Sequence, residues 1–500
     1  MTPAPRRAEA RLVVALAALA GLRVLVFAGA FPFFSNVDEH MHVDAALKYS
    51  RGYLPRPGTG GYEPEVVEWV ALFGSPEYLW VEGSGAGPMP PPTWRKPRAE
   101  RLRGIRDTRA FFKGRINLEA YQPPAYYAVA GAWLKLGRAL GFDGGGLLYW
   151  LRSLNALAWC ALLLVAYGFL REAYPANALV RLGVPLLLAV FPQDALYYVT
   201  PDAFSPLFAG AGFCLWLHLA RRPQSSAWTY AAAGLAVAAA VLLKYSNATL
   251  LVVSGLCTAH LLATRPGARS LRDTGGRLAL AWGVLALPIG GWLVRNQLVF
   301  ADATGVAAKL AHMGWGTKRF AEYWDHPLFT ASGLGTFAGE LLATLWRGEL
   351  AWHHVDLAWP AADAFYVASS ALLVLLVALR LARGPDAGGA RGVEAVALAE
   401  LLAYGALLAL LSLRFRFPDH GNPSAARPFF LQGRLMSGAL LPLLLLYVRG
   451  IQLAASSLPA RARPLAAWLG LGAVAALVAI SELALSRDVF LSEFNWYHLP

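Results

Sequence analysis

The first candidate catalytic residues follow the first apolar segment of the chain, where Asp38, Glu39 and His42 stand within five positions of one another. Ionisable side chains beside hydrocarbon are costly and persist mainly where they have a function. Adjacent carboxylates raise each other's pKa, so this pair could supply a general base or hold a hard divalent cation. A polar helix cap at the membrane surface is the structural alternative.

The histidines in this cluster, His40 and His42, lack a partner at a spacing typical of zinc sites. We therefore expect that no metal or other cofactor is required. A divalent ion at Asp38 and Glu39 is the alternative.

Cationic residues stand at the ends of three later apolar segments. Lys244 interrupts one segment, Arg295 ends another, and Arg434 begins a third. The planar fork of arginine fits phosphate, and several cations at one membrane face would form a phosphate clamp. Each cation alone is more often an interface anchor. Asp202 adds a carboxylate at an outer turn, where a helix N-cap is an equally good interpretation.

Aromatic and histidine side chains form a third candidate set. Tyr126 lies in the segment Tyr-Gln-Pro-Pro-Ala-Tyr-Tyr at residues 121–127, and Trp352, His353 and His354 lie in a later polar stretch. Such side chains can stack on sugar rings and form hydrogen bonds with hydroxyls. Trp and Tyr are also expected at a membrane interface without any such role.

The elements that carry these residues must be membrane-spanning helices. Hydrophobic residues make up 57% of the 500 residues and charged residues only 15%, which is too apolar for a soluble domain. Apolar stretches of about 20 residues recur along the chain, and each is long enough to cross a bilayer as a helix. The net charge of +13 does not indicate nucleic-acid binding, because the basic residues lie in short loops that orient membrane spans.

The basic loops predict the topology. Five basic loops should be cytoplasmic, as should the N-terminus with Arg6 and Arg7: residues 171–181, 221–222, 265–277, 380–391 and 449–463. This arrangement predicts an all-α polytopic membrane protein with about 11 transmembrane helices, within a range of 10–13. Residues 1–500 form one integral membrane domain, with extracytoplasmic loops at residues 33–146 and 299–359. Residues 121–140 should not cross, and the first loop should contain juxtamembrane helices.

Taken in order, these motifs resemble the C-type (GT-C) superfamily of integral membrane glycosyltransferases. The acidic segment at residues 37–42 resembles the motif that follows the first span in that superfamily. Residues 121–127 resemble the PPxYY segment of its protein mannosyltransferase-like and lipid A aminoarabinose transferase-like members. Asp202 and the Arg295-Asn296 pair stand where those members carry an outer-turn acid and an RN pair.

The resemblance is closest to a prokaryotic GT-C-like family of predicted membrane proteins, which shows DExxH after the first span and QGRY before a later one. Residues 38–42 fit DExxH, and the segment from Trp346 to Pro360 fits a late W...P motif. Gln432, Gly433 and Arg434 fit the start of QGRY, but Leu435 stands in place of the tyrosine.

The resemblance implies transfer of a sugar, with inversion, from a polyprenyl-phosphate carrier to an acceptor hydroxyl on a glycan, lipid or protein. The protein would lie in the prokaryotic plasma (inner) membrane, with its active site on the extracytoplasmic face. Asp38 would be the general base, assisted by Glu39, His42 and Asp202. The donor phosphate would be bound by Lys244, Arg295 and Arg434.

Two other functions use similar residues. A transporter or flippase also needs charges in the membrane, but it would favour broken helices at the midplane and an internal repeat. A polysaccharide polymerase or ligase would differ mainly in using a lipid-diphosphate donor. A membrane scaffold whose outer loop binds a partner is the non-catalytic alternative.

Overall fold

The computed structural model describes residues 3–35, 38–78, 89–264, 268–353, 355–384 and 390–499. One candidate residue, His354, lies outside these ranges.

Nine helices in the described ranges are long and apolar enough to cross a membrane, some of them together with a preceding 3-10 turn. Two shorter apolar helices, α7 (Ala178–Ala189) and α9 (Ala227–Leu243), are also present, and the total of about 11 transmembrane helices stays a prediction. The all-α polytopic fold is confirmed. The nine are α1 (Pro3–Ala30), α6 (Gly144–Ala173), α8 (Ser205–Arg221), α10 (Leu250–Ala263), α11 (Ala268–Phe300), α14 (Pro360–Ala382), α15 (Ala390–Arg414), α16 (Leu440–Ala455) and α17 (Arg463–Phe490).

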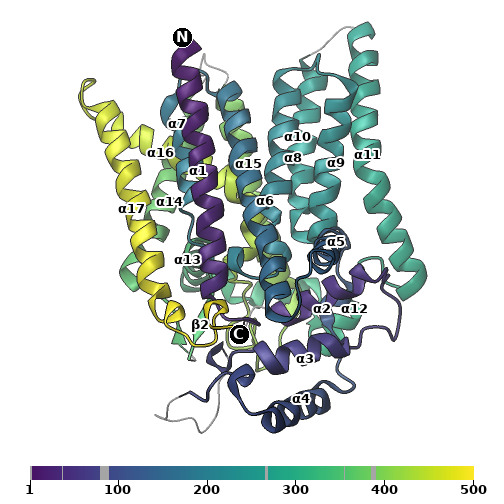
Figure 1. The fold of residues 1–500 in the computed structure, drawn as a ribbon. Helices are drawn as coiled ribbons and strands as arrows, with labels where there is room; N and C mark the ends of the chain where they lie inside the picture. The colour runs from purple at the N-terminus through teal and green to yellow at the C-terminus, as the bar shows by residue number, and fades with distance from the viewer. Residues whose placement is uncertain are drawn as a thin grey trace.

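Short helices gather at the end of the bundle opposite the N-terminus (Figure 1). They include α2 (Glu39–Ser50), α3 (Pro64–Phe73), α4 (Arg98–Phe112) and α12 (Ala307–His312). Helix α5 (Ala125–Ala139) lies there too and is seen almost end-on, across the direction of the long helices (Figure 1). The segment that should not cross therefore forms a helix at the end of the bundle.

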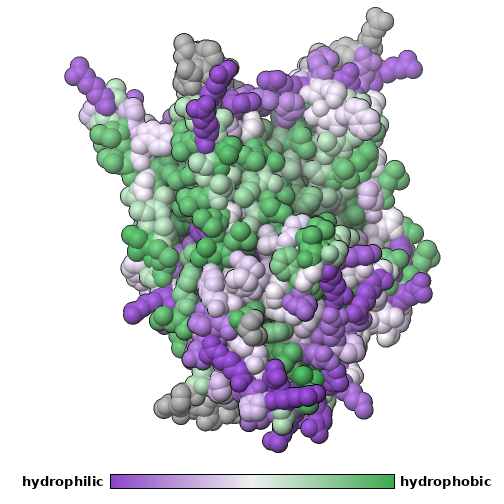
Figure 2. Space-filling model, viewed as in Figure 1, coloured by the Kyte–Doolittle hydropathy of each residue, from purple (hydrophilic) through white to green (hydrophobic). Residues whose placement is uncertain are grey.

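Hydrophobic side chains form a broad belt around the long helices, with hydrophilic side chains at both ends (Figure 2). This distribution fits helices whose backbone groups are paired internally while their side chains face lipid. The end that carries α2, α3 and α4 is mostly hydrophilic (Figure 2).

One pair of short strands joins the segment between α11 and α14 to the bundle, and a second pair lies within the segment. Strand β1 (Gly316–Thr317) pairs antiparallel with β4 (Phe415–Arg416), directly after α15. Helix α13 (Ala331–Arg347) follows, and β2 (Ala351–Trp352) pairs antiparallel with β3 (Val355–Asp356) before α14. Contacts distant in sequence thus fix the polar end of the molecule.

Helix α16 is the central helix of the bundle. It packs against α7, α14, α15 and α17. Together with the preceding 3-10 turn η9 (Gly433–Ala439) it forms one candidate span, and 83% of the 18-residue apolar stretch in that span is buried. The corresponding figure for α11 is 17%. Arg434 in η9 is therefore presented from the most enclosed helix of the bundle.

Candidate functional site

Asp38 stands immediately before α2 with its carboxylate uncommitted. Its backbone has φ 64° and ψ 19°, in the left-handed region that non-glycine residues adopt uncommonly. The half-buried side chain forms no capping bond and has no hydrogen-bond or ion-pair partner anywhere in the described ranges. Its charge nevertheless acts on His42, Lys309 and Arg434. This combination of backbone strain and a free charged group is typical of a functional position.

Glu39, the next residue, is completely engaged. Arg152 of α6 donates to both of its carboxylate oxygens at 2.7 Å, and backbone N–H groups of Phe34, Ser35 and Val199 donate at 2.9, 3.3 and 2.9 Å. Both side chains are at most 1% exposed. With five donors on two oxygens, Glu39 has no lone pair left for a metal or a proton, so the pair with Asp38 does not fit a divalent site.

His42 belongs to a buried chain of polar contacts that runs from α2 to α12. Its Nδ1 lies 2.8 Å from the Tyr127 hydroxyl, which donates to Glu119 at 3.4 Å. Glu119 also forms an ion pair with Lys309. Burial raises the pKa of Glu119, but the charges of Lys309 and His42 outweigh it and bring the pKa to about 2. Burial lowers the pKa of His42, and the Glu119 carboxylate, which stays ionised, lies close to its imidazole.

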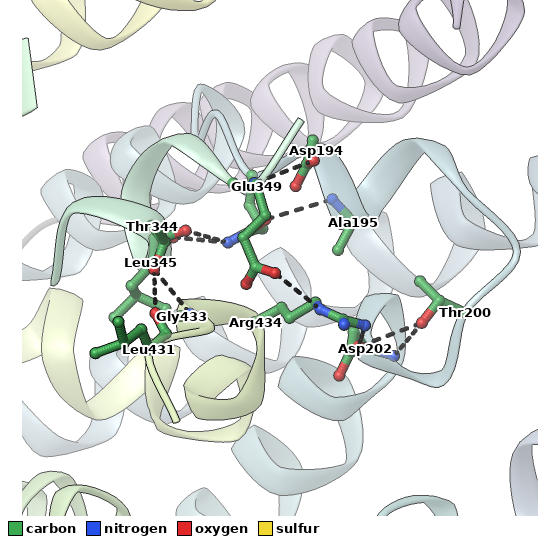
Figure 3. Close-up of polar contacts among 12 residues, drawn as sticks. Asp194, Ala195, Thr200, Asp202, Thr344, Leu345, Glu349, Leu431, Gly433 and Arg434 are labelled. Atoms are coloured by element: carbon green, nitrogen blue, oxygen red, sulfur yellow. Dashed lines mark hydrogen bonds and ion pairs between the residues drawn. The ribbon is translucent and has the colours of Figure 1, made fainter. Parts of the chain in front are cut away.

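Asp202 brings together two of the predicted phosphate-binding cations. Lys244 forms an ion pair with one carboxylate oxygen, and Arg434 Nη1 lies 3.4 Å from the other. Arg434 reaches between Asp202 and Glu349, whose carboxylate lies 3.3 Å from its Nε (Figure 3). Both contacts of Arg434 are long, and its Nη2 has no partner within the described part of the chain. The fork therefore keeps donors free.

A second carboxylate lies behind Glu349. The backbone N–H of Glu349 donates to Asp194 at 3.2 Å (Figure 3), and Gly348 has φ +85° where an added Cβ would collide with the Asp194 carboxylate. Burial and the charge of Glu349 raise the pKa of Asp194 to about 7. Burial also raises the pKa of Glu349.

The sequence motif around Arg434 has a packing explanation. A Cβ at Gly433 would overlap the backbone of Thr344 and Leu345 at the end of α13, so only glycine allows this approach. The N–H of Gly433 donates to the Thr344 hydroxyl at 2.9 Å. Gln193 donates to the carbonyls of Thr344 and Leu345 at 3.0 and 2.9 Å, which satisfies acceptors that the helix end leaves open. These contacts fix where Arg434 projects.

Arg295, the third predicted phosphate-binding residue, contacts a different set of groups. It donates to Asn296 Oδ1 at 2.9 Å and to the Pro55 carbonyl. Its guanidinium carbon lies 5.1 Å from the ring centre of Trp292 and 5.3 Å from that of Phe300. The structure therefore unites Lys244 and Arg434 on Asp202 and gives Arg295 contacts that join the 53–55 loop to α11.

The predicted sugar-binding residues fall into two places. Tyr126 is 2% exposed and packs against Tyr127 and Phe204, so its ring offers no surface for a ligand. Trp352 and His353 line an open cavity with Glu77, and the N–H of His353 donates to the Glu77 carbonyl at 2.8 Å. Within the described ranges, no hydrogen bond or ion pair connects Trp352 or His353 to Asp38, Asp202 or Arg434.

Sequence reasoning missed several members of the cluster. Glu119 stands only two residues before Tyr121 of the 121–127 motif, and this proximity was a usable signal. Lys309 and Glu349 offered none, because each meets its partner across a long stretch of chain. Among the described residues, no group of three or more His, Cys, Asp or Glu side chains could hold a metal ion.

No protein-family model matches the chain, and no curated protein matches it. Solved structures of similar shape include the oligosaccharyltransferase from Archaeoglobus fulgidus in complex with Zn and sulfate (12% identity, TM-score 0.45, covering 95% of this chain and 53% of that chain). Another is the archaeal oligosaccharyltransferase AglB from Archaeoglobus fulgidus in complex with an inhibitory peptide and a dolichol-phosphate (11% identity, TM-score 0.44, covering 97% and 56%). The chain spans about half the length of these proteins.

Proposed function

We propose that the protein is a GT-C-type glycosyltransferase. It transfers a sugar from a polyprenyl-phosphate-linked donor to an acceptor hydroxyl at the extracytoplasmic face of a prokaryotic plasma membrane. Support comes from the ordered motifs of the sequence and, above all, from one observation. The carboxylate of Asp38 has no hydrogen-bond or ion-pair partner among the described residues. It acts electrostatically on Lys309 and Arg434 at the polar end of the bundle.

Asp38 is the general base of the proposed reaction. It accepts the proton of the acceptor hydroxyl as the hydroxyl oxygen attacks the anomeric carbon. The bond between that carbon and the phosphate oxygen breaks, the polyprenyl phosphate leaves with the bonding electrons, and the anomeric configuration inverts. An acid that already had several donors, such as Glu39, would be a poor base because its lone pairs are occupied.

Lys244 and Arg434 bind the phosphate of the donor. Arg434 keeps unused N–H donors. Its side chain is 20% exposed and that of Lys244 is 19% exposed, so both can be reached by a ligand. Fixed cations stabilise charge that develops on a leaving phosphate and need no rearrangement during the reaction. Asp202 holds both cations in the resting state and separates when the phosphate binds. Arg295 belongs to this group only through its place in the sequence, and we propose that it orients the 53–55 loop.

His42 and Glu39 assist without touching the reacting atoms. Glu39 with Arg152 fixes the start of α2 and therefore the position of Asp38. His42 joins α2 to Tyr127 and Glu119, and Lys309 is anchored there as a third cation close to Asp38. We propose that Glu39 and His42 are positioning residues. No metal is needed for this mechanism, because the three cations supply the positive charge.

The test compares Asp38→Asn with Lys244→Gln in purified protein supplied with a radiolabelled polyprenyl-phosphate sugar and a membrane extract as acceptor. We expect Asp38→Asn to lower transfer by about 100-fold or more, in the range typical of a general base, with donor affinity unchanged. We expect Lys244→Gln to weaken donor binding by about tenfold, which corresponds to ~1.4 kcal/mol.

Arg222→Gln is the matched control, because this arginine is exposed at the opposite end of the bundle. It should change neither quantity. Transfer by Asp38→Asn at the wild-type rate would exclude Asp38 as the base. Equal donor affinity in wild type and Lys244→Gln would exclude the phosphate role of Lys244.

A further inference from the structure

A basic cavity opens next to Asp38 at the polar end of the molecule. Its volume is about 740 Å³, within the range of ligand-binding pockets, and its wall includes Tyr62, Arg109, Phe112, Lys113 and Arg115. Among the described residues, no acidic side chain lines it. A recess with walls of one charge sign concentrates the electric field and attracts ligands of the opposite charge.

Tyr62 in the cavity wall lies within the electrostatic reach of the proposed catalytic base. His40, two residues after Asp38, stacks on Tyr62 with ring centres 5.9 Å apart and an angle of 12°. Tyr62 meets Phe112 edge to face at 4.6 Å. The charge of Asp38 acts on both His40 and Tyr62. A ligand on Tyr62 and Phe112 would therefore lie within the electrostatic reach of Asp38.

The loops that form the cavity are rigidly placed. Gly61 and Ile116 form an antiparallel bridge, and Asn117 N–H donates to the Gly60 carbonyl at 2.7 Å. A Cβ at Gly60 would lie 2.5 Å from the Tyr121 hydroxyl. Asp44 accepts a hydrogen bond from the Glu63 N–H at 2.7 Å. The backbone around Tyr62 is thus tied to α2 and to the 121–127 motif.

The charge of the surrounding helix favours an anion. Residues 98–116 contain seven Lys and Arg and only two acids, and no residue of α4 is buried. Arg109 has one surface partner, Glu68, and exposed pairs of this kind contribute little. Lys113 is exposed and its ammonium has no partner in the part of the chain that the structure describes. Cations can therefore turn to a ligand without losing internal contacts.

We infer that this cavity binds an anionic saccharide, which is the acceptor of the reaction proposed above. The inference rests on that proposed function. Basic side chains would pair with carboxylates or phosphates of the saccharide, while Tyr62 and Phe112 would contact its rings. Helices α3 and α4 lie beyond α2 as seen from the long helices (Figure 1) and in the hydrophilic end of the molecule (Figure 2). This position favours a soluble saccharide over a lipid headgroup.

The test measures binding of a fluorescent oligogalacturonate to the full-length protein in phosphatidylcholine nanodiscs, without a donor. Its methyl ester is the neutral probe of the same length. We expect the acid to bind and the ester to bind at least tenfold more weakly. Arg109→Gln/Lys113→Gln should weaken binding of the acid by tenfold or more. The matched control Arg98→Gln/Arg103→Gln removes two exposed arginines of α4 that do not line the cavity, and its affinity should stay within twofold.

Several results would overturn the inference. These are equal binding of acid and ester, equal loss in the control variant, and no binding of the acid at millimolar concentration. Competition by phosphatidylglycerol in the nanodiscs that depends on Arg109 and Lys113 would assign the cavity to a lipid headgroup. Saccharide binding is measured without a donor, and therefore without transfer. A failure of sugar transfer and a failure of saccharide binding are therefore distinguishable.

Discussion

Asp38 and Glu39 are adjacent in sequence but lie in opposite environments. The Glu39 carboxylate is buried under five donors, whereas the Asp38 carboxylate is half-buried with no partner in the described ranges. The Glu39 carboxylate, with its five donors, contributes to stability. The free Asp38 carboxylate, at a strained backbone position, is available for chemistry. Mutations at the two positions should therefore separate stability from activity.

Arg152→Met should destabilise the protein severely. Removing one partner of a buried ion pair leaves an uncompensated charge and costs about 3–5 kcal/mol. Arg152 is also the donor to the carbonyls of Ala28, Phe31 and Pro32 at 2.7, 2.5 and 2.9 Å, so the end of α1 should loosen as well. Thermal unfolding of detergent-solubilised protein measures this loss. Asp38→Asn is the control and should unfold at the wild-type temperature. An unchanged Tm for Arg152→Met would mean that the Glu39 ion pair does not hold this end of the protein.

Asp194 should make donor binding depend on pH near neutrality. Burial and the charge of Glu349 raise the pKa of Asp194 to about 7, from an ordinary value of 3.8. Folding therefore favours the protonated form: the stability associated with it is complete below about pH 4 and is lost as the pH rises through about 7. The negative charge formed above pH 7 adds to that of Glu349 next to Arg434. We expect affinity for polyprenyl phosphate to fall about fivefold between pH 6 and 8, or ~1 kcal/mol.

Asp194→Asn tests this prediction, because the amide cannot ionise and keeps nearly the same volume. Donor binding by this variant, measured by fluorescence quenching across the same pH range, should be nearly constant. A variant that keeps the full wild-type pH dependence would assign the titration to another group.

Individual residues of the cluster differ in how far the sequence could predict them. Asp202, Lys244 and Arg434 are recognisable because each charge interrupts or ends an apolar segment. The contacts of Lys244 and Arg434 with the Asp202 carboxylate follow from the packing of α8, α9 and α16, which no local sequence pattern encodes. Lys309 could not be predicted, because its pairing with Glu119 joins positions 190 residues apart.

At the scale of elements, the junction between α13 and η9 determines where the cations stand. Gly348 ends α13 with φ +85° and lies against Asp194, and Glu349 directly follows it. Gly433 packs on the same helix end, so Glu349 and Arg434 approach from two chain segments that meet there. The position of Arg434 therefore depends on a close approach of two backbones.

Gly348→Ala should disturb this junction. The backbone at φ 85° and ψ −165° is essentially restricted to glycine and costs an L-residue about 1–3 kcal/mol, and the added methyl group would collide with the Asp194 carboxylate. We expect a lower unfolding temperature and weaker donor binding, because Glu349 would shift relative to Arg434. Gly335→Ala in the same helix meets no atom within 4 Å and should be neutral or stabilising by up to about 1 kcal/mol. Equal effects of the two variants would argue that the junction does not position Arg434.

Membrane helices were the elements most predictable from sequence, because hydropathy and length decide a span almost alone. The short helices at the polar end were less predictable from sequence. Residues 95–113 are strongly basic, and residues 98–112 form helix α4. Its packing on α3 depends on contacts that hydropathy does not report.

The whole molecule carries basic residues at both ends, and this affects its orientation. The turns between spans are short and basic on the N-terminal side, which predicts that this side is cytoplasmic. Helix α4 is strongly basic at the opposite end. The positive-inside rule counts loops up to about 60 residues, whereas α4 lies within the connection between α1 and α6, at residues 31–143. The charge of α4 should therefore not reverse the topology.

Single cysteines test this orientation and with it the side on which the proposed chemistry occurs. Arg103→Cys in α4 and Arg461→Cys before α17 both replace exposed arginines. The natural cysteines, Cys160, Cys214 and Cys257, lie within α6, α8 and α10. Maleimide labelling of the wild-type protein gives the background from these three cysteines. A membrane-impermeant maleimide should label Arg103→Cys in intact cells and Arg461→Cys only after permeabilisation. The reverse pattern would place Asp38, Lys244 and Arg434 on the cytoplasmic side, where a lipid-linked donor exposed at the outer face could not reach them.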